Sequence, residues 1–278
     1  MNTHDSLVST PDRAPRRQRY PVVLRQLEVL DVRVLSRSMV RVVLGGEELK
    51  GFASLGFDDH VKMFFPVPGD VVPILPHVGP DGLEMRKDGL KPLARDYTPR
   101  HFDAAKNELH IDFAIHHEGP ASLWARAVKP GDGAWIAGPR GSFIIPFTFD
   151  WHLLVSDETG LPAVQRRLAE LPASARALVL VEVDGREDEL PMESAAEVET
   201  IWVHRHKGSV AIEAPLVSAL RERALPQGDG FAWIGCESAV AKDLRRLLVE
   251  ERGMNPKWVR ASGYWRRGAS GVHDHYDE

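Results

Sequence analysis

The sequence has a single cysteine, Cys236, among its 278 residues. A disulfide within the chain and an iron–sulfur cluster held by cysteines are therefore excluded, and this cysteine usage is typical of a cytoplasmic protein. No apolar run reaches the roughly 18 residues that a membrane-spanning helix needs, and the first residues lack the layout of a secretory signal. A Gly-x-Ser-x-Gly motif is also missing, which argues against a hydrolase. We expect a cytoplasmic protein without a membrane span.

Surplus charge is small and local. The net charge is −5, which argues against nucleic acid as a partner. Residues 182–199 contain eight acidic residues and one basic residue, so the rest of the chain is slightly basic. The net charge therefore does not exclude an anionic small-molecule ligand.

Two kinds of pattern divide the chain near Pro146. Before it, short β-branched segments between Pro and Gly turns, such as 38–44 and 108–115, predict a β-barrel or sandwich. After it, buried strands such as 177–183 alternate with helical patterns such as 238–252, which predicts a parallel sheet covered on both faces. Such a pair of domains leaves a cleft between them for a ligand.

We expect four segments. They are a disordered arm at 1–19, a β domain at 20–147, an α/β domain at 148–268 and a flexible tail at 269–278. The arm carries Arg13, Arg16, Arg17 and Arg19, and a nucleic-acid or membrane arm is the alternative interpretation. Histidines and acids at 116–118 and 273–278 do not form a complete ligand set, so we expect no metal site.

Arg95-Asp96-Tyr97-Thr98 is the first motif that could bind a ligand. Arginine offers a planar fork for a phosphate, Tyr97 on the same strand face offers a flat surface for a ring, and Thr98 adds a hydroxyl. These are the groups that a nucleotide-like ligand needs. The alternative is a strand with a surface arginine and a packed tyrosine.

A strand that ends at Asp112-Phe113-Ala114-Ile115-His116 precedes the second motif, Gly119-Pro120-Ala121-Ser122. A helix that begins near Ser122 would present backbone N–H groups to a phosphate. With Arg95 it predicts a diphosphate site. His116 and His117 have the alternative interpretation of ordinary histidines at a strand end.

Taken in order, several motifs resemble the siderophore-interacting protein family, the ferric-siderophore reductases of the ferredoxin–NADP reductase-like group. The resemblance covers about residues 18–268. It rests on Asp59-His60-Val61-Lys62, Arg95-Asp96-Tyr97-Thr98, Gly119-Pro120-Ala121-Ser122, Gly131-Asp132, Gly138-Pro139-Arg140-Gly141, Asp157-Glu158-Thr159-Gly160-Leu161-Pro162-Ala163, Trp233-Ile234-Gly235-Cys236-Glu237 and Tyr264-Trp265-Arg266-Arg267-Gly268.

The resemblance implies a Greek-key β-barrel that binds FAD and an α/β domain that binds the nucleotide of NADPH or NADH. Arg95 would then contact the FAD diphosphate, Tyr97 would pack along the flavin ring and Thr98 would lie near its reactive edge. The remaining implied FAD contacts are Asp112, Phe113, Ala114 and His116 on the adenine and ribose side, and Gly119, Ala121 and Ser122 at the diphosphate. The implied nucleotide-site residues of the second domain are Asp157, Glu158, Thr159, Ala163 and Glu237. We expect Cys236 to be a small buried hydrophobic residue.

The implied reaction transfers a hydride from NAD(P)H to FAD and then single electrons to siderophore-bound Fe(III), which releases Fe(II). Lys62, Arg266 and Arg267 would form a positive rim for a ferric siderophore, which we expect to be anionic. Only about ten residues follow Gly268, so NAD(P)H is favoured over ferredoxin as donor. The alternatives are a general NAD(P)H–flavin oxidoreductase, a ferredoxin-dependent siderophore reductase and a non-catalytic siderophore binder. We expect a monomer.

Overall fold

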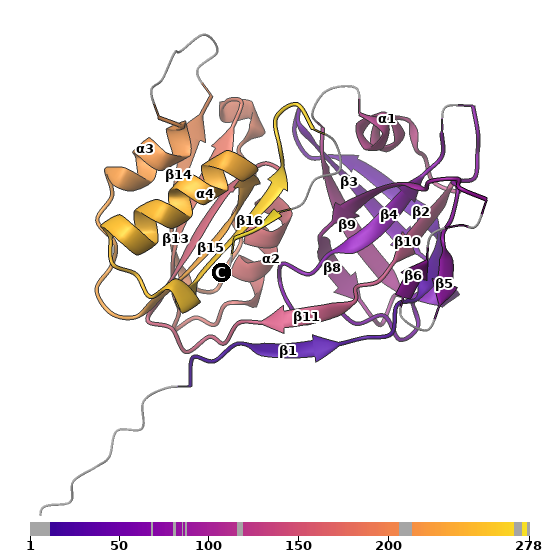
Figure 1. Cartoon of the computed structure of the whole chain (residues 1–278). Coiled ribbons are helices and arrows are strands. Elements are labelled where there is room, and N and C mark those ends of the chain that lie inside the picture. Colours follow the sequence, from indigo (N-terminus) through magenta and orange to yellow (C-terminus); the bar gives the residue numbers. More distant parts are fainter. Residues whose placement is uncertain are drawn as a thin grey trace, which may run out of the picture.

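The computed structural model describes residues 12–67, 69–79, 82–84, 86, 88–115, 119–205, 213–269 and 274–276. Two sheets dominate this part of the chain (Figure 1). One has seven antiparallel strands between Leu24 and Ala137, and the other has six mostly parallel strands between Trp151 and His275. Helix α2 (Leu161–Glu170) packs against strands of both sheets. The prediction of an antiparallel barrel followed by an α/β unit is confirmed.

The first sheet closes into a barrel at Thr98. Its strand order is β7-β4-β10-β2-β3-β9-β8, and every neighbouring pair is antiparallel. Its strands are β2 (Leu24–Val34), β3 (Met39–Gly45), β4 (Val61–Phe65), β7 (Leu93–Tyr97), β8 (Pro99–Asp103), β9 (Glu108–Ala114) and β10 (Gly133–Ala137). Strands β7 and β8 are the two edges of the sheet, yet only Thr98 separates them in the chain. The sheet must therefore curl until its edges meet at this residue.

Alternating burial along the strands builds the barrel core. In β2, Leu27 and Val29 are buried while Glu28 and Leu30 are exposed, as expected for a strand with one face inside. Helix α1 (Pro120–Ala127) lies over one end of the barrel (Figure 1), and its Ala121 and Ala125 belong to the core. The helix start thus stands at the rim of the barrel.

The second sheet has the order β14-β13-β12-β15-β16-β17, in which only β17 is antiparallel. Its strands are β12 (Trp151–Asp157), β13 (Arg176–Val183), β14 (Glu197–His204), β15 (Gly230–Glu237), β16 (Val259–Trp265) and β17 (Asp274–His275). The chain begins at β12, moves outward to β14 and returns to β15 on the other side of β12. Ligands bind at such a switch point, beyond the carboxyl ends of the two central strands.

Helices cover both faces of this sheet. Helix α2 packs on the face toward the barrel, and α3 (Pro215–Arg221) and α4 (Ser238–Arg246) pack on the other (Figure 1). Cys236 is buried in the layer under α3 and α4, as expected. The minor elements are β5 (His77–Gly79), β6 (Gly82–Glu84), the short helices Glu47–Leu49, Arg186–Asp188 and Pro256–Trp258, and a π-helical turn at Leu247–Glu251.

The N-terminal arm differs from its prediction. Strand β1 (Arg16–Arg19) pairs antiparallel with β11 (Gly141–Ile144), so the prediction of disorder is wrong for residues 16–19. Backbone hydrogen bonds and the Arg17 guanidinium over the ring of Phe143, 5.2 Å from its centroid, hold this polar strand. A hydrophobic pattern could not reveal it. In the predicted flexible tail, β17 pairs with β16.

Buried polar contacts lock the two sheets together. The Arg166 guanidinium on α2 donates to the backbone oxygens of Pro99 and Ser54, both at 2.8 Å. From β16, Arg260 Nε donates to Asp58 Oδ2 at 2.7 Å. These contacts therefore fix the position of the barrel relative to the parallel sheet.

Candidate functional site

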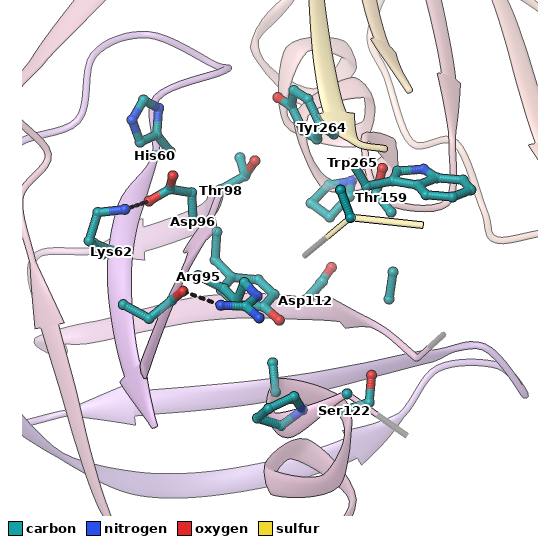
Figure 2. Close-up of a pocket in the computed structure, with 18 residues that line it drawn as sticks. His60, Lys62, Arg95, Asp96, Thr98, Asp112, Ser122, Thr159, Tyr264 and Trp265 are labelled. Atoms are coloured by element: carbon teal, nitrogen blue, oxygen red, sulfur yellow. Dashed lines mark hydrogen bonds and ion pairs between the residues drawn. The ribbon is translucent and has the colours of Figure 1, made fainter. Parts of the chain in front are cut away.

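A cavity of about 340 Å³ lies between the barrel rim, the start of α1, the start of α2 and the end of β16 (Figure 2). Ten of the residues predicted from the sequence line it. They are Lys62, Arg95, Tyr97, Thr98, Asp112, Ala114, Gly119, Ala121, Ser122 and Thr159. Residues from five separate segments thus meet where the two domains face each other.

Strand β7 brings Arg95 and Tyr97 into the cavity on one strand face. Arg95 Nη1 donates to the backbone oxygen of Ala94 at 2.7 Å, and no carboxylate of the described residues pairs with this guanidinium (Figure 2). Tyr97 packs against Phe113 with ring centroids 4.4 Å apart. Burial raises the pKa of Tyr97, so its hydroxyl stays protonated.

Arg41, which the sequence analysis missed, neutralises Asp112. Its Nε and Nη2 donate to the two carboxylate oxygens of Asp112 at 2.6 and 2.7 Å. The carboxyl of Asp112 is fully buried. The negative charge of Asp112 is therefore offset by Arg41 and would not repel an anionic ligand beside it. Cross-strand pairing between β3 and β9 places the two residues opposite each other, a relation that the sequence does not show.

The start of α1 borders the same cavity. Gly119 occupies the N-cap position and offers no side chain, and Pro120 follows as the first helical residue. The first N–H groups of a helix cannot bond within it, and such a terminus favours negative charge. A Cβ at Gly119 would meet nothing within 4 Å, so a ligand can approach the backbone there. His116 lies outside the described residues.

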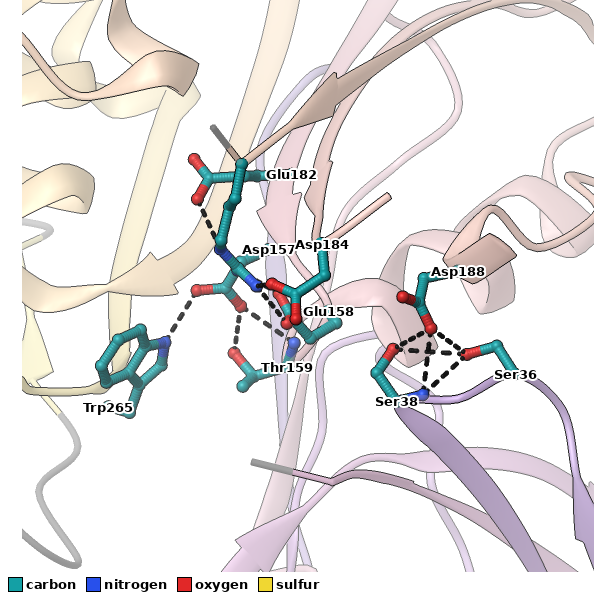
Figure 3. Close-up of polar contacts among 10 residues, drawn as sticks. Ser36, Ser38, Asp157, Glu158, Thr159, Glu182, Asp184, Asp188 and Trp265 are labelled. Carbon is teal, nitrogen blue, oxygen red and sulfur yellow. Dashed lines mark hydrogen bonds and ion pairs between the residues drawn. The ribbon is translucent and has the colours of Figure 1, made fainter. Parts of the chain in front are cut away.

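Asp157 joins the carboxyl ends of three strands rather than facing the cavity. Its Oδ1 accepts from the backbone N–H of Thr159 at 2.9 Å, and its Oδ2 accepts from Trp265 Nε1 at 2.7 Å (Figure 3). The same Oδ2 also accepts from the backbone N–H of Glu237 at 3.1 Å. Glu237 in turn caps α4, since its Oε2 accepts from the N–H groups of Ala239 and Val240. Both acids therefore hold the shape of the switch point.

Three other predicted site residues lie inside the protein. Phe113 and Ala163 have no exposed surface and belong to the cores of the barrel and of the α2 layer. Glu158 is 1% exposed and forms an ion pair with Arg205. Arg205, at the end of β14, also pairs with Glu182 and Asp184. Arg205 could not be predicted from the sequence, because it meets Glu182 only when β14 pairs with β13.

The cations of the predicted rim are only partly at the cavity. Lys62 lines it, and its Nζ donates to Asp96 Oδ1 at 2.7 Å (Figure 2). Arg266 and Arg267 follow β16 at the surface and are not among the lining residues. Instead, Tyr264 and Trp265 from the same segment line the cavity. That segment belonged to the family-like motifs, but only its arginines were singled out.

The lining of this cavity suits a ligand with a diphosphate and a flat ring. Arg95 and the start of α1 offer positive potential, and Tyr97 and Trp265 offer aromatic surfaces. Thr98 at the barrel seam adds a hydroxyl between them. These residues fit FAD.

The two sheets and the cavity between them have the ferredoxin-reductase-like fold. A ferredoxin reductase of a carbazole 1,9a-dioxygenase has the same fold, with a TM-score of 0.61 at 17% identity over 86% of this chain and 69% of that one. Two family models match, the siderophore-interacting FAD-binding domain at residues 28–143 and the siderophore-interacting protein at residues 149–268. The chain belongs to the siderophore-interacting protein family.

Individual relatives agree with this assignment. The chain is 40% identical to an NADPH-dependent ferric-chelate reductase of Escherichia coli, over 92% of this chain and 98% of the relative. It is 30% identical to the ferric vibriobactin reductase of Vibrio cholerae, over 88% and 90%. The crystal structure of a siderophore utilization protein from T. fusca has a TM-score of 0.86 at 39% identity, over 94% and 99%. In the part of the chain that the structure describes, no helix could cross a membrane.

Proposed function

We propose that this protein reduces siderophore-bound Fe(III) with electrons from NADPH or NADH, through FAD bound in the cavity between the domains. One observation carries the proposal. Within the described residues, an arginine without a carboxylate partner, a helix start without a side-chain cap and a buried tyrosine line one cavity. The relatives that are named as ferric-chelate and ferric vibriobactin reductases support iron as the electron acceptor.

Residues of the barrel would bind and orient the cofactor. Arg95 and the first turn of α1 bind the diphosphate, Tyr97 packs along the ring and Thr98 donates a hydrogen bond near its reactive edge. The adenine and ribose side lies toward Asp112, Ala114 and His116. When bound, FAD supplies the conversion between the electron pair of a nicotinamide and the single electrons that Fe(III) accepts. Fe(II) binds hard oxygen ligands less tightly than Fe(III), so reduction releases the metal.

Residues of the α/β domain would shape the nucleotide site. Asp157 and Glu237 hold the ends of β12 and β15 at the switch point, which is where this fold class binds its nucleotide. Thr159 and Trp265 face the cavity. We favour NADPH because the named relative of E. coli depends on it. Lys62, Arg266 and Arg267 would attract an anionic ferric siderophore in the cytoplasm.

The absorbance spectrum and steady-state kinetics of the purified protein test this function. We expect a flavin spectrum, and oxidation of NADPH or NADH that depends on added ferric siderophore. A colourless protein that cannot be reconstituted with FAD would overturn the assignment. Iron reduction with reduced ferredoxin but with neither nicotinamide nucleotide would overturn the donor. Nucleotide oxidation with free flavin but not with Fe(III) would indicate a general flavin reductase.

The variant Arg95→Ala tests the diphosphate site. Loss of a hydrogen bond to a charged group costs about 1.5–3 kcal/mol, so we expect the dissociation constant of FAD to rise about 10-fold to 150-fold. Fluorescence titration of the apoprotein with FAD measures this constant. Arg126→Ala removes an exposed arginine from the last turn of α1 and should leave the constant unchanged. Equal constants for both variants would show that Arg95 does not bind the cofactor.

A further inference from the structure

A second and larger cavity, of about 1160 Å³, lies beside the first. Its walls come from β1, β11, α4 and β16, elements that Figure 1 labels. His60 lines both cavities, and they therefore adjoin at this residue. Strand β1, the segment expected to be a disordered arm, forms one wall. The sequence analysis assigned no function to any residue of α4.

The lining of this basic cavity carries more positive than negative charge. Six of its side chains are basic, namely Arg17, Arg19, Lys242, Arg245, Arg246 and Arg260, and four are acidic, namely Asp58, Asp59, Asp243 and Glu250. Two of the cations are neutralised within the wall. Arg260 pairs with Asp58 at 2.7 Å, and Arg246 pairs with Asp243 at 3.3 Å.

The four remaining cations have no carboxylate partner among the described residues. They are Arg17, Arg19, Lys242 and Arg245. The buried Nε of Arg245 also finds no hydrogen-bond acceptor within that part of the chain. Charged groups that line a cavity without counter-charges repel one another, and this repulsion costs stability unless a ligand compensates it.

Of the two acids left, Asp59 does not compensate these cations. Its Oδ2 accepts hydrogen bonds from the hydroxyls of Ser54 and Ser142 and from the N–H of Gly56. Burial raises its pKa, so the protein opposes its ionisation. Among the described residues that line the cavity, Glu250 is then the one acid left to offset the four cations. The cavity therefore retains a positive potential.

Size and charge together limit the ligand. Sites for drug-sized ligands have volumes of about 300–1,000 Å³, so this cavity suits a ligand at or above the upper end of that range. The cations come from two sides, β1 and α4, and would surround a bulky anion. Their potential would select a compact polyanion over a neutral complex of the same size. An Fe(III) complex with several catecholate or carboxylate oxygens has this charge and bulk.

We infer that the basic cavity between β1 and α4 holds the body of a polyanionic ferric chelate, with Arg17, Arg19, Lys242 and Arg245 as its counter-charges. This inference rests on the proposed function. The chelate would then reach the flavin-side cavity at His60. The predicted rim of Lys62, Arg266 and Arg267 would lie at a different edge and serve the approach of the ligand.

Gallium complexes test the inference without electron transfer, because Ga(III) has the size of Fe(III) and is not reduced by flavins. The flavin-loaded protein is titrated with a trianionic Ga(III) tris-catecholate and with a neutral Ga(III) tris-hydroxamate, by calorimetry at low and at moderate salt. We expect tighter binding of the trianionic complex, and weakening of only that binding by salt. Equal affinities for the trianionic and the neutral complex, or no binding of the trianionic complex, would overturn the inference.

Three variants with the same loss of charge locate the site. We expect R17Q/K242Q/R245Q to bind the trianionic complex about tenfold or more weakly, and the neutral complex as before. K91Q/K129Q/K257Q removes exposed lysines outside both cavities and should bind as the wild type. If K62Q/R266Q/R267Q loses the affinity and the cavity variant keeps it, the chelate binds at the rim and the inference is wrong. The single variants R245Q and K242Q give the same readout if the triple variant does not fold.

Iron reduction by the wild type separates the two levels of failure. A wild type without FAD or without reduction of ferric chelates contradicts the proposed function. A wild type that reduces the ferric tris-catecholate, with an unchanged KM in the cavity variant, contradicts the inference alone. We expect the cavity variant to raise KM for this complex and to keep the rate at which the neutral ferric tris-hydroxamate is reduced, because that complex carries no charge for the cavity cations to bind.

Discussion

Two charged regions of this molecule differ in how their charges are paired. At the carboxyl edge of the parallel sheet, Glu158, Glu182 and Asp184 surround Arg205 and are bound to it (Figure 3). The basic cavity has four cations without a carboxylate partner among the described residues, namely Arg17, Arg19, Lys242 and Arg245. In the first region each of these charged groups has an oppositely charged partner, and in the second the four cations have none among the described residues. Paired charge is explained by the fold alone, whereas unpaired charge around a cavity points to a ligand.

Burial sharpens this comparison at the acidic edge. The Glu158 side chain is 2% exposed and that of Arg205 is 26% exposed. Burial by itself lowers the pKa of Arg205, but its carboxylate neighbours, Glu158 first, outweigh this effect and raise it. For the acid Glu182 burial has the opposite effect and raises the pKa, and Arg205 opposes that rise. Removal of Arg205 would therefore leave all three carboxylates without their ion-pair partner.

The largest effect should follow from breaking this network. Arg205→Ala leaves a buried carboxylate without its partner, so we expect the free energy of unfolding to fall by about 3–5 kcal/mol. Chemical denaturation followed by tryptophan fluorescence measures this change. The matched control is Arg223→Ala, which breaks the exposed pair with Glu199 and should cost less than about 1 kcal/mol. A loss below about 1 kcal/mol for Arg205→Ala would place this network with the ordinary surface pairs.

Much of the fold was open to prediction from local patterns. The buried strands such as Ala177 to Val183 and the helix at 238–252 are periodic enough to stand out. Strand β1 was not, because its residues are polar and exposed and its pairing with β11 is made by the backbone across more than a hundred residues of chain. Local pattern carries no information on such a long-range partner.

The candidate site was predictable where a motif places its own residues together. Arg95 and Tyr97 alternate on β7, Thr98 follows that strand directly, and all three reach the cavity. Counter-charges were not predictable, because Arg41 meets Asp112 and Arg205 meets Glu158 only through the strand order. For the same reason Asp157 was assigned to a ligand site, although the folded chain supplies its hydrogen bonds.

His152 is a third case, an unpartnered polar group that faces no cavity. It is fully buried between Phe149 and Phe231, and neither ring nitrogen has a hydrogen-bond partner among the described residues. Burial, with a smaller contribution from Arg167, lowers its pKa from 6.5 to about 3. The folded state thus keeps His152 neutral, while the unfolded chain takes up a proton below pH 6.5.

Acid should therefore weaken the fold through this residue. The contribution of His152 is complete above its unfolded pKa and is lost as the pH falls below it, by about 2 kcal/mol at about pH 5. Urea unfolding of the wild type and of His152→Leu at about pH 7.5 and about pH 5 measures the effect as the difference between the two pH dependences. Parallel pH dependences would mean that His152 is protonated in the folded state.

The smallest effect on stability is expected from loss of charge in the basic cavity, and it tests whether the cations there are unpaired. If Lys242 and Arg245 have no partner in the protein, K242Q/R245Q breaks no ion pair and removes mutual repulsion. We expect its free energy of unfolding to stay within about 0.5 kcal/mol of the wild type, with any gain largest at low salt. Denaturation at low and at moderate salt measures this without a ligand. A loss above about 1 kcal/mol, the range of a broken network rather than of an exposed charge, would show that the protein already supplies counter-charges. The contrast with Arg205 would then disappear, and with it the reason to seek an anion in this cavity.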